Sequence, residues 1–509
     1  MDEVVPQRVA GGGVNGGVQM NVRDVIVVGA GFGGLSAGAL LAKRGQDVLL
    51  LEGSNELGGC AGKFDRHGYR FAVGATLGMG FEAGGTLSDL YQELGLPLPQ
   101  MQLLPIIMDV HLPDMDIRYH QEKERWYAEL ERLFPLEHPR MIAFYEELFH
   151  IAGIFQKIIA AKPMFPPVDW QGVKQVLGMA NLENAKLVPY MLQTVHDRLK
   201  KYDLAGHRQF VAFLNGQLID AVQTTVEGCP AFLGYIALNV FHRGAFYVYG
   251  GLATVAEDLA RSIRNSGSEV RLRSRVQKIA KQGELWEVTT AKGQTFSAKQ
   301  LVLNNSIHNL HGLLDADLGH RMRVREEEEK ARPAWGAYAL YLGCEDVFKT
   351  EALFHQFIER YDAPLTEGNQ FLVSLSAPDD RLRTEPGKRA LTISTHTELD
   401  RWWERERYEE LKDAYTERIL TSLERQFPQV RGAVDVSLPA TPVTFQRFVL
   451  REQGKVGGYI PSGKFSWMSS YSPMSGVEGM WLCGDTVFPG AGTLGTALSG
   501  WMVADRICR

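Results

Sequence analysis

The chain has 509 residues, of which 45% are hydrophobic and 22% charged, a composition typical of folded globular proteins. This composition excludes a disordered chain, a collagen and a coiled coil. Lys and Arg number 54 against 60 Asp and Glu, so the net charge of -6 gives nucleic-acid binding no electrostatic support. The five cysteines are far apart and form no Cys-x-x-Cys pair, which argues against a disulfide framework or a zinc site and favours a reducing compartment.

The N-terminal residues 1–20 are acidic at the start and then rich in glycine, without the basic start and apolar core of a secretory signal. We therefore predict a loose tail over these residues. No run of about 18 uninterrupted apolar residues occurs, so a bilayer-spanning helix is not expected. The sequence predicts a cytoplasmic protein, and peripheral attachment to a membrane surface is a hypothesis.

A glycine-rich turn near the N-terminus joins a predicted strand to a predicted helix. Residues 25–28 are a β-branched run typical of a buried parallel strand, and residues 29–34 read Gly-Ala-Gly-Phe-Gly-Gly. An apolar helical pattern covers residues 35–43, and a second strand over residues 48–51 ends at Glu52. This order is the context that the dinucleotide-binding motif Gly-x-Gly-x-x-Gly requires.

Each residue type in this unit has a physical role. Gly29 permits the tight turn, Gly31 lets the backbone approach a pyrophosphate, and Gly34 lets the helix pack close to the strand. The start of the helix offers unpaired N–H groups and the positive end of the helix dipole to a phosphate. Glu52 is placed to accept hydrogen bonds from both ribose hydroxyls and to repel a 2′-phosphate, which argues against NADP.

Two further patterns follow this unit and carry a family resemblance. A glycine doublet stands at Gly58 and Gly59, and residues 64–76 form an aromatic-rich stretch that ends in Gly-Ala-Thr. Such doublets are typical of FAD-binding enzymes of the amine oxidase and phytoene desaturase superfamily. The chain resembles its carotenoid branch, which includes bacterial phytoene desaturases, plant carotenoid isomerase and retinol saturase. The resemblance implies FAD as the cofactor.

Three later segments extend the resemblance. Tyr-Gly-Gly-Leu at residues 249–252 precedes a predicted helix over residues 254–265 and an alternating stretch that reaches Val276. The resemblance implies that the backbone of Val276 contacts the adenine. Residues 441–458 are similar to the segment that precedes the Gly-Asp motif in carotenoid desaturases. An apolar strand then ends at Gly484, and the resemblance assigns Asp485, the next residue, to the ribityl chain or phosphate of FAD.

A second Gly-x-Gly-x-x-Gly match, at residues 490–495, does not indicate a second nucleotide domain, because the chain ends 14 residues later. We predict a helix from Thr496 to about Arg506 whose N-terminus faces the pyrimidine end of the flavin. The helix dipole would then stabilise the negative charge of reduced flavin. No other dinucleotide motif occurs, so NAD(P)H is not an evident reductant.

These segments predict an α/β fold with a Rossmann-like FAD-binding domain assembled from discontinuous segments and an inserted α+β substrate domain. The FAD-binding domain would comprise residues 21–76, 243–310 and 477–509. Residues 77–242 and 311–476 would form the substrate or membrane-facing domain. The predicted cofactor-binding residues are Gly29, Gly31, Phe32, Gly33, Gly34, Glu52, Gly58, Gly59, Gly74, Ala75, Val276, Gly484, Asp485, Gly492 and Thr493.

The first insertion is aromatic and mostly helical in pattern. Apolar residues recur at helical spacing over residues 144–159, and prolines follow over residues 163–167. A membrane-dipping patch or the mouth of a tunnel is one interpretation, but we favour a core helix for most of these residues. The candidates for exposure are Phe165 and Trp170, near the prolines.

The second insertion has predicted strands around residues 337–343, 371–376 and 391–395. A helix over residues 405–426 would place Tyr408, Leu411, Tyr415, Ile419 and Leu423 on one face. The acidic run at residues 326–329 is interpreted as a solvated helix surface and not as a metal site.

No catalytic residue can be identified from the sequence. No Ser/His/Asp set or metal-spaced cluster occurs, and His396 and Cys60 are both interpreted as structural residues. The absence of such a set is consistent with flavin chemistry, in which the cofactor carries the redox step and the protein supplies placement and dryness. We expect residues 74–76 and 492–493 to lie closest to the flavin ring.

The leading hypothesis is an FAD-dependent desaturase that removes hydrogen from an apolar, carotenoid-like polyene by hydride transfer to flavin N5, with oxygen or a quinone as electron acceptor. Two enzymatic alternatives stay open: a redox-neutral cis–trans isomerase that uses reduced FAD, and an oxidase of a diapocarotenoid terminal methyl. An amine oxidase is disfavoured because Cys60 follows the doublet in place of the arginine common in that branch. The non-enzyme alternative is a prenyl-protein escort resembling the GDP dissociation inhibitors.

Overall fold

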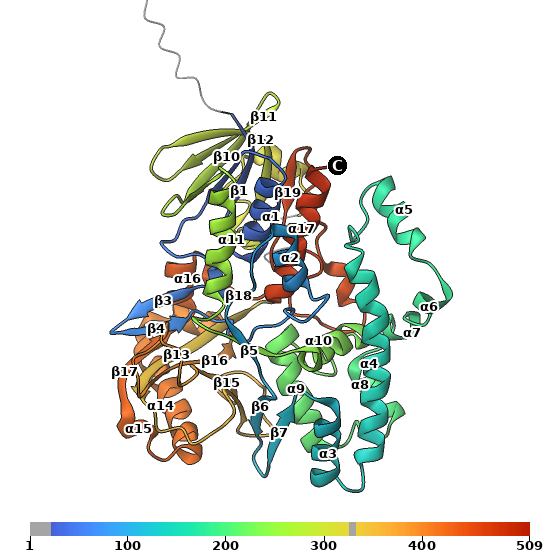
Figure 1. Ribbon diagram of the computed structural model, residues 1–509, viewed down its shortest axis with the longest axis vertical. Coiled ribbons are helices and arrows are strands. Elements are labelled where there is room, and N and C mark those ends of the chain that lie inside the picture. The colour runs from blue at the N-terminus through green and yellow to red at the C-terminus, as the bar shows by residue number, and fades with distance from the viewer. Residues whose placement is uncertain (1–21, 325–331) are drawn as a thin grey trace, which may run out of the picture.

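The computed structural model describes residues 22–324 and 332–509, and it arranges them around two β-sheets (Figure 1). In Figure 1 the upper sheet contains the first strand of the chain and lies beside the C-terminal helix, and the second sheet lies below it. The predicted tail of residues 1–20 and the predicted charged surface at residues 326–329 lie outside the described residues.

The upper sheet has seven strands from segments that are far apart in the sequence. They are β1 (Arg23–Val28), β2 (Val48–Leu51), β9 (Glu269–Arg271), β10 (Val276–Gln282), β11 (Leu285–Thr290), β12 (Thr295–Leu303) and β19 (Met480–Leu482). β1 lies between β2 and β12, and the pairs β2–β9 and β12–β19 extend this parallel centre. β10 and β11 are antiparallel and continue the sheet beyond β12. The alternating stretch before Val276 is not one strand, because the chain turns at Arg273, where φ is +53°.

Three helices pack beside this sheet: α1 (Phe32–Lys43), α11 (Ala253–Asn265) and α17 (Gly492–Ile507). α1 and α17 approach closely, and a Cβ atom at Gly500 would clash with the carbonyl oxygen of Gly33. α17 begins four residues before the predicted start at Thr496. Glycine disfavours helix formation, but packing against α1 outweighs this preference here.

The lower sheet has eight strands and combines both insertions. Its strands are β6 (Ile106–His111), β7 (Asp116–His120), β13 (Trp335–Glu345), β14 (Phe354–Ile358), β15 (Gln370–Leu375), β16 (Lys388–Thr397), β17 (Val434–Ala440) and β18 (Lys455–Val456). The three predicted strands of the second insertion are confirmed as β13, β15 and β16. The first insertion is less helical than predicted, since it supplies β6 and β7 and also β5 (Met101–Leu103).

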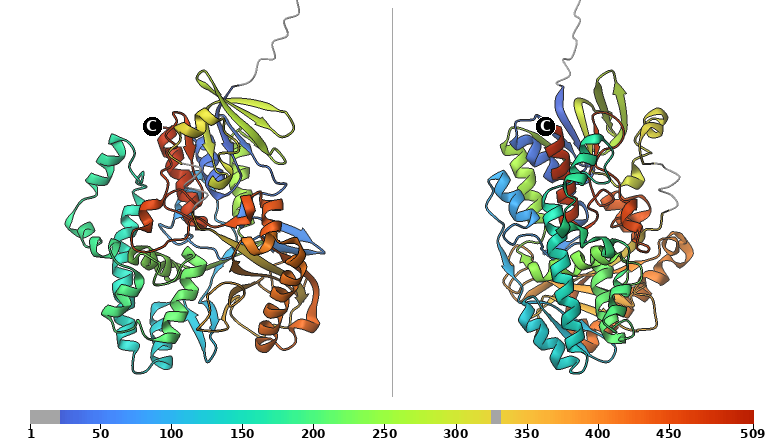
Figure 2. Two further views of the ribbon diagram at one scale, coloured as in Figure 1. Left: turned by 180° about the vertical axis from the view of Figure 1, so that it is seen from behind. Right: turned by 90° about the vertical axis from the view of Figure 1, so that its right-hand side faces the viewer.

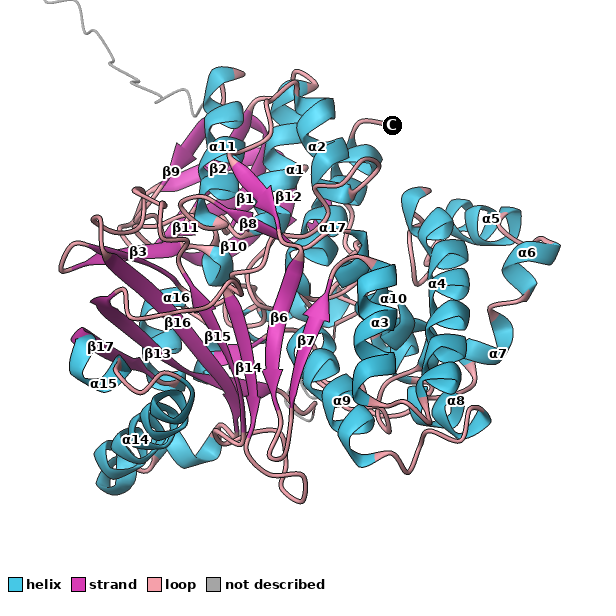
Figure 3. Cartoon of the chain, turned by 60° about the horizontal axis from the view of Figure 1, so that its bottom comes forward, coloured by secondary structure: helices cyan, strands magenta, loops and turns pink. Residues whose placement is uncertain are grey.

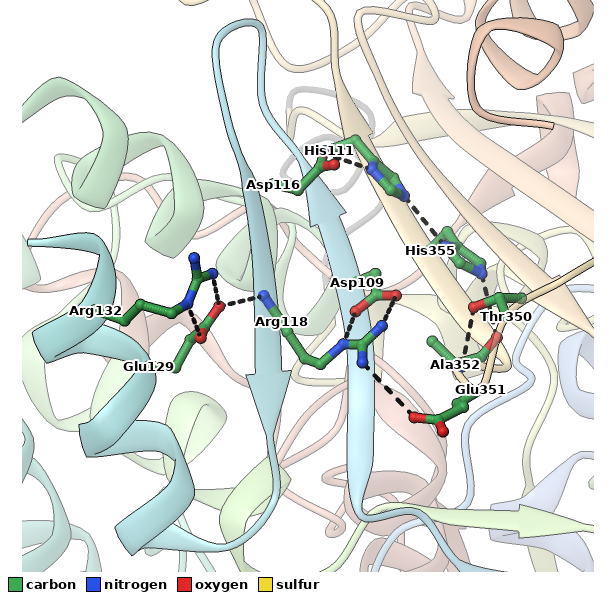
Figure 4. Close-up of polar contacts among 10 residues, drawn as sticks. All are labelled: Asp109, His111, Asp116, Arg118, Glu129, Arg132, Thr350, Glu351, Ala352 and His355. Atoms are coloured by element: carbon green, nitrogen blue, oxygen red, sulfur yellow. Dashed lines mark hydrogen bonds and ion pairs between the residues drawn. The ribbon is translucent and has the colours of Figure 1, made fainter. Parts of the chain in front are cut away.

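The two insertions meet where β6 and β14 pair in parallel (Figure 4). His111 on β6 contacts His355 on β14 through their ring nitrogens at 3.1 Å, and its other nitrogen lies 2.8 Å from a carboxylate oxygen of Asp116. Burial lowers the pKa of His355 to about 3, so this ring is neutral at neutral pH. The polar contacts across this seam join segments that are more than 200 residues apart.

Helices cover both faces of the eight-stranded sheet (Figure 3). α14 (Tyr408–Gln426) packs on one face through its predicted apolar side, and Tyr415, Ile419 and Leu423 are buried there. The opposite face meets α9 (Arg208–Val222) and lies near α10 (Ala231–Arg243). The helices of residues 138–201 form one flank of the molecule (Figure 2).

The remaining elements connect or flank these layers. The helices are α2 (Thr86–Leu94), α3 (Lys123–Leu133), α4 (His138–Ala160), α5 (Trp170–Gly178), α6 (Leu182–Ala185), α7 (Val188–Met191), α8 (Val195–Lys201), α12 (Ala316–Arg321), α15 (Val430–Ala433) and α16 (Pro442–Val449). The strands are β3 (Lys63–Arg66), β4 (Tyr69–Ala72) and β8 (Phe246–Val248). No helix among the described residues is both long enough and apolar enough to cross a bilayer.

Candidate active site

The glycine-rich turn between β1 and α1 has the geometry that its sequence predicts. Gly29 has φ of +99°, a conformation that a residue with a side chain rarely adopts. A Cβ atom at Gly34 would overlap the carbonyl oxygen of Gly29, so this glycine is required for the close packing of the helix start. A Cβ atom at Gly31 would lie 2.8 Å from the side-chain nitrogen of Asn304.

Asn304 is a structural partner of this turn that sequence reasoning missed. It follows β12, and its side-chain nitrogen donates a hydrogen bond to the carbonyl oxygen of Gly29 at 3.2 Å. A Cβ atom at Gly33 would lie only 2.5 Å from its side-chain oxygen. The signal in the sequence was its place directly after a buried strand, where the carboxyl ends of parallel strands meet.

Glu52 lies at the end of β2 and faces the same turn. Its two carboxylate oxygens accept hydrogen bonds from the backbone N–H groups of Ala30, at 2.6 Å, and Ser54, at 2.7 Å. Burial raises the pKa of Glu52 above its usual value, although these backbone hydrogen bonds oppose the rise. Each oxygen keeps a second lone pair, so the predicted ribose contact remains compatible with this geometry.

A cavity of about 960 Å³, which we call the glycine-rich cavity, opens over these residues. Most of the predicted cofactor-binding residues line it: Gly29, Gly31, Phe32, Gly33, Glu52, Gly58, Gly59, Ala75, Val276, Gly484, Asp485, Gly492 and Thr493. Gly34 does not, because it lies beneath the turn, and Gly74 lines a second cavity instead. The three discontinuous segments therefore converge on one site.

Asp485 is paired with an arginine that the sequence did not single out. The guanidinium of Arg451 lies 2.6 Å from the Asp485 carboxylate and donates a second hydrogen bond to the carbonyl oxygen of Gly457 at 3.0 Å. Both side chains are at least 86% buried. Cys60 lies close to this pair, and burial raises the pKa of its thiol, which argues against a reactive thiolate.

The glycine-rich cavity also contains polar atoms suited to a bound dinucleotide. Asn305 and Ser306 line it, and the side-chain oxygens of both residues are buried without a hydrogen-bond partner in the described part of the chain. Buried polar atoms are normally satisfied. A cavity of this size with a glycine cradle, the buried carboxylate of Glu52 and two unsatisfied oxygens fits a bound FAD.

A second cavity of about 1060 Å³ adjoins the first, and we call it the apolar cavity. The two share the lining residues Cys60, Val73, Ala75, Phe445, Gly457, Gly492 and Thr493. Most of its wall is apolar and includes Phe155, Ile159, Phe232, Ile236, Phe241 and Leu498. Of the residues predicted to lie near the flavin ring, Ala75, Gly492 and Thr493 stand at the junction of the two cavities, and Gly74 and Thr76 line the apolar cavity beside it.

The aromatic helix α4 serves both as core and as cavity wall. Phe144, Leu148 and Ile151 are buried in the core, as the sequence predicted, whereas Phe155 and Ile159 line the apolar cavity. The prediction that Phe165 is exposed was wrong.

Phe165 is half-buried in this cavity wall because its ring packs against Trp467 and Phe488. Trp170 is 67% exposed, as predicted.

His396 and Asp220 are two of the titratable groups that line the apolar cavity. His396 lies on β16, and burial lowers its pKa to about 4. Asp220 lies on α9, and sequence reasoning missed it because an isolated acid in a helical pattern carries no local signal. Gln223, three residues further along the chain, also lines the cavity.

Comparisons with known proteins identify the family. The chain is 26% identical over 501 residues to prolycopene isomerase of Daucus carota, covering 95% of this chain and 80% of the relative. It is 26% identical over 402 residues to a 4,4′-diapophytoene desaturase of Methylomonas sp, covering 73% of each chain. The solved structure of cyclohexylamine oxidase from Brevibacterium oxydans IH-35A has the same fold, with a TM-score of 0.60, 16% identity, and coverage of 96% of this chain and 100% of that one.

Residues 32–508 match the family described as flavin containing amine oxidoreductase. The match runs from the end of the glycine-rich turn through both insertions and α17. Because it covers nearly the whole chain and the fold agrees, the chain belongs to the flavin containing amine oxidoreductase family and is an FAD-dependent oxidoreductase.

Proposed function

We propose that this protein desaturates a carotenoid-like polyene, with FAD as the oxidant. The observation that carries the proposal is the direct junction between the glycine-rich cavity and the apolar cavity at Ala75, Gly492 and Thr493. A long hydrocarbon has no charge and few polar groups, and a wall of aliphatic and aromatic side chains suits it. A polyene in the apolar cavity would therefore reach the flavin ring.

We propose the following roles for residues of the glycine-rich cavity. Residues 29–34 hold the pyrophosphate at the start of α1, Glu52 accepts hydrogen bonds from the ribose, and the backbone of Val276 contacts the adenine. Asp485, held by Arg451, binds the ribityl chain or phosphate of FAD. When bound, FAD supplies a two-electron oxidant that accepts a hydride, and the chain contributes placement and exclusion of water.

The predicted domain division is part of this proposal. Each sheet would support one ligand: the parallel sheet with β1 at its centre supports the cofactor, and the eight-stranded sheet supports the substrate. The strands from the two insertions share one sheet, which supports grouping residues 77–242 with residues 311–476.

Redox-neutral cis–trans isomerisation of a polyene is the second candidate function. It is supported by the match to prolycopene isomerase, which covers 95% of this chain, whereas the match to the desaturase covers 73%. Both reactions require the same two cavities, so the geometry of the described residues is compatible with either one.

We also propose peripheral attachment to a membrane surface, with oxygen or a quinone as the electron acceptor. Helices α5 to α7 expose apolar side chains, with Trp170 67%, Leu177 62% and Leu182 91% exposed. The same segment lines the apolar cavity through Val176 and Leu187. An apolar substrate dissolved in lipid would then enter the cavity without crossing water.

The experiment that tests the function is an anaerobic incubation of the FAD-loaded protein with phytoene, a shorter diapocarotenoid analogue and a poly-cis polyene in liposomes. Flavin bleaching together with a product lighter by two or more hydrogens is the expected result. A product of unchanged mass but altered retention, formed only after the flavin is reduced beforehand, would replace desaturation by isomerisation. The absence of any product from all three polyenes would overturn the proposal.

A further inference from the structure

Asp220 occupies an unusual place for a carboxyl group, on the wall of the apolar cavity. It lies in the last turn of α9, is half-buried, and lines that cavity. Both its oxygens accept hydrogen bonds from side-chain amides: Gln356 donates at 2.6 Å and Gln370 at 3.0 Å. Among the described residues, no lysine, arginine or histidine forms an ion pair with it.

The amides that hold Asp220 form a dedicated network. Gln217, Gln356 and Gln370 are fully buried, and Gln217 donates a hydrogen bond to the side-chain oxygen of Gln356 at 3.0 Å. α9 has a glycine at position 216, where a Cβ atom would overlap that same oxygen of Gln356. The helix therefore lacks a side chain at the point where the glutamine must pass to reach the carboxyl group.

Asp220 also lies near the junction of the two cavities. The hydroxyl of Thr76, next to Ala75 at the junction, contacts the Ser374 hydroxyl at 2.6 Å. Gln356 pairs in register with Leu372, two residues before Ser374. By standard strand geometry the Cα atoms of Gln356 and Ser374 are therefore about 8 Å apart. Gln223, one turn after Asp220, abuts Gly457, which lines both cavities.

We propose that Asp220 is a catalytic residue that exchanges a proton with the polyene in the apolar cavity. This inference rests on the proposed function and supplies the proton-transfer group that the sequence did not reveal. In desaturation, bound FAD would supply the two-electron oxidant that takes one hydrogen of the polyene as a hydride, and the neighbouring hydrogen leaves as a proton. The Asp220 carboxylate takes that proton, and the electron pair of the broken C–H bond becomes the new π bond.

The same group serves the second candidate reaction without any electron transfer. The carboxylic acid form of Asp220 gives its proton to one carbon of a cis double bond, and conjugation spreads the resulting cation. Rotation about the bond, now single, and return of the proton to the carboxylate yield the trans isomer. The two reactions therefore require opposite protonation states of one residue.

The surroundings of Asp220 keep both protonation states within reach. Burial raises its pKa to about 7, while the hydrogen bonds from Gln356 and Gln370 oppose that rise. The titratable groups on the elements around it are Arg208 on α9, Tyr235, His242 and Arg243 on α10, and His355 on β14. The other titratable groups that line the cavity are Cys60, Asp89, Lys162, Arg243 and His396. None of these groups is a hydrogen-bond or ion-pair partner of Asp220 among the described residues.

The test compares FAD-loaded wild type with Asp220→Asn and Gln370→Met. Turnover by wild type is measured from pH 5 to pH 9 with the polyene that gives product, and deuterium exchange into recovered polyene is followed in D₂O. Desaturation should rise with pH through about 7, since it needs the carboxylate, and isomerisation should fall through the same range. Asp220→Asn should lower the rate at least 100-fold. It should also abolish the change of rate near pH 7, which we call the pH limb, and the deuterium exchange.

Gln370→Met removes a donor that favours the carboxylate, so the pH limb should move up by about one pH unit while polyene binding is retained. Infrared titration of the FAD-loaded protein, wild type against Asp220→Asn, reads the carboxyl group directly and without turnover. It should show one carboxyl group that titrates near pH 7 in wild type only. Should Asp220→Asn fail to fold, the shift of the pH limb in Gln370→Met and the infrared titration of wild type test the role of Asp220.

A wild-type rate and pH profile in a folded Asp220→Asn protein would overturn the inference and leave the proposed function intact. The same holds for an unmoved pH limb in Gln370→Met, or for an infrared titration without a carboxyl group near pH 7. Failure of wild type to convert any of the three polyenes would instead overturn the proposed function. Gln217→Met removes an amide that holds Gln356 rather than Asp220 itself, so it should move the pH limb less than Gln370→Met does.

Discussion

The glycine-rich cavity and the apolar cavity are nearly equal in volume, about 960 and 1060 Å³, but they are built in different ways. The first is made from backbone turns, glycines and the carboxyl ends of parallel strands. The second is walled by side chains from α4, α10, the α5–α7 segment and one face of the eight-stranded sheet. The cofactor site therefore depends on local backbone geometry, whereas the substrate site depends on the packing of side chains from many elements.

This difference has a consequence for substitutions. In the glycine-rich cavity, an atom added at a glycine meets closely packed neighbours. Loss of one member of the buried ion pair leaves the other charge without its partner. In the apolar cavity most residues contribute only part of a wall, and their side chains can rearrange. We therefore expect the largest losses at the first cavity and milder, more specific losses at the second.

The largest effect should come from breaking the buried pair of Arg451 and Asp485. Arg451→Met leaves the Asp485 carboxylate without its cation and should lower the free energy of unfolding by about 3–5 kcal/mol. Denaturant unfolding of the FAD-loaded protein measures this loss. The double variant Arg451→Met/Asp485→Asn removes the unpaired charge and should recover part of it; a single variant as stable as wild type would contradict the assignment of the pair.

A smaller loss is expected from Gly500→Ala, where α17 crosses α1. The added methyl group meets the carbonyl oxygen of Gly33, and the overpacking should cost about 1–3 kcal/mol and reduce FAD occupancy. Thermal unfolding and flavin absorbance measure both effects. Gly153→Ala in α4 is the matched control, because nothing lies within 4 Å of its Cβ position, and it should not destabilise the fold. Equal stability of the two variants would show that the helix contact is not tight.

Glu52→Ala should weaken FAD binding about tenfold or more, because it removes a carboxylate that accepts two backbone hydrogen bonds and that we propose binds the ribose. FAD titration of the apoprotein measures the change. Glu52→Gln keeps the size and one acceptor, and it should lose less. Near-normal occupancy in Glu52→Ala would overturn the ribose assignment.

The smallest effect on stability is expected at the rim of the apolar cavity. Trp170→Ser with Leu182→Ser removes two exposed apolar side chains and should change the free energy of unfolding by less than about 0.5 kcal/mol. Flotation with liposomes should nevertheless become about tenfold weaker. Trp403→Ser, at a tryptophan that is 40% exposed in a different region, is the control and should float as wild type does. Unchanged flotation of the double variant would rule out this surface as the membrane contact.

The cofactor half of the molecule was largely predictable from its sequence. The turn over residues 29–34, Glu52 and Asp485 are short motifs whose spacing specifies a strand, a turn and a helix, and 13 of the predicted residues line one cavity. Their partners were not predictable. Arg451 acts across a gap of 34 residues, and no local pattern distinguishes it from an ordinary loop position. Asn304 acts across 275 residues, and its place after a buried strand did not specify its contact with Gly29.

The sequence by itself determined the fold class and the dinucleotide turn, because these depend on local periodicity, on glycine conformations and on motif spacing, and the family resemblance of its motifs implied FAD as the cofactor. Only the tertiary structure decided that β6 and β7 join the sheet of the second insertion, that Phe165 turns inward, and that Asp220 meets Gln356 and Gln370 on a cavity wall. The physical reason is that these features arise from contacts between residues far apart in the chain. The burial and polarity of such residues are set only when the two sheets and their helices have packed.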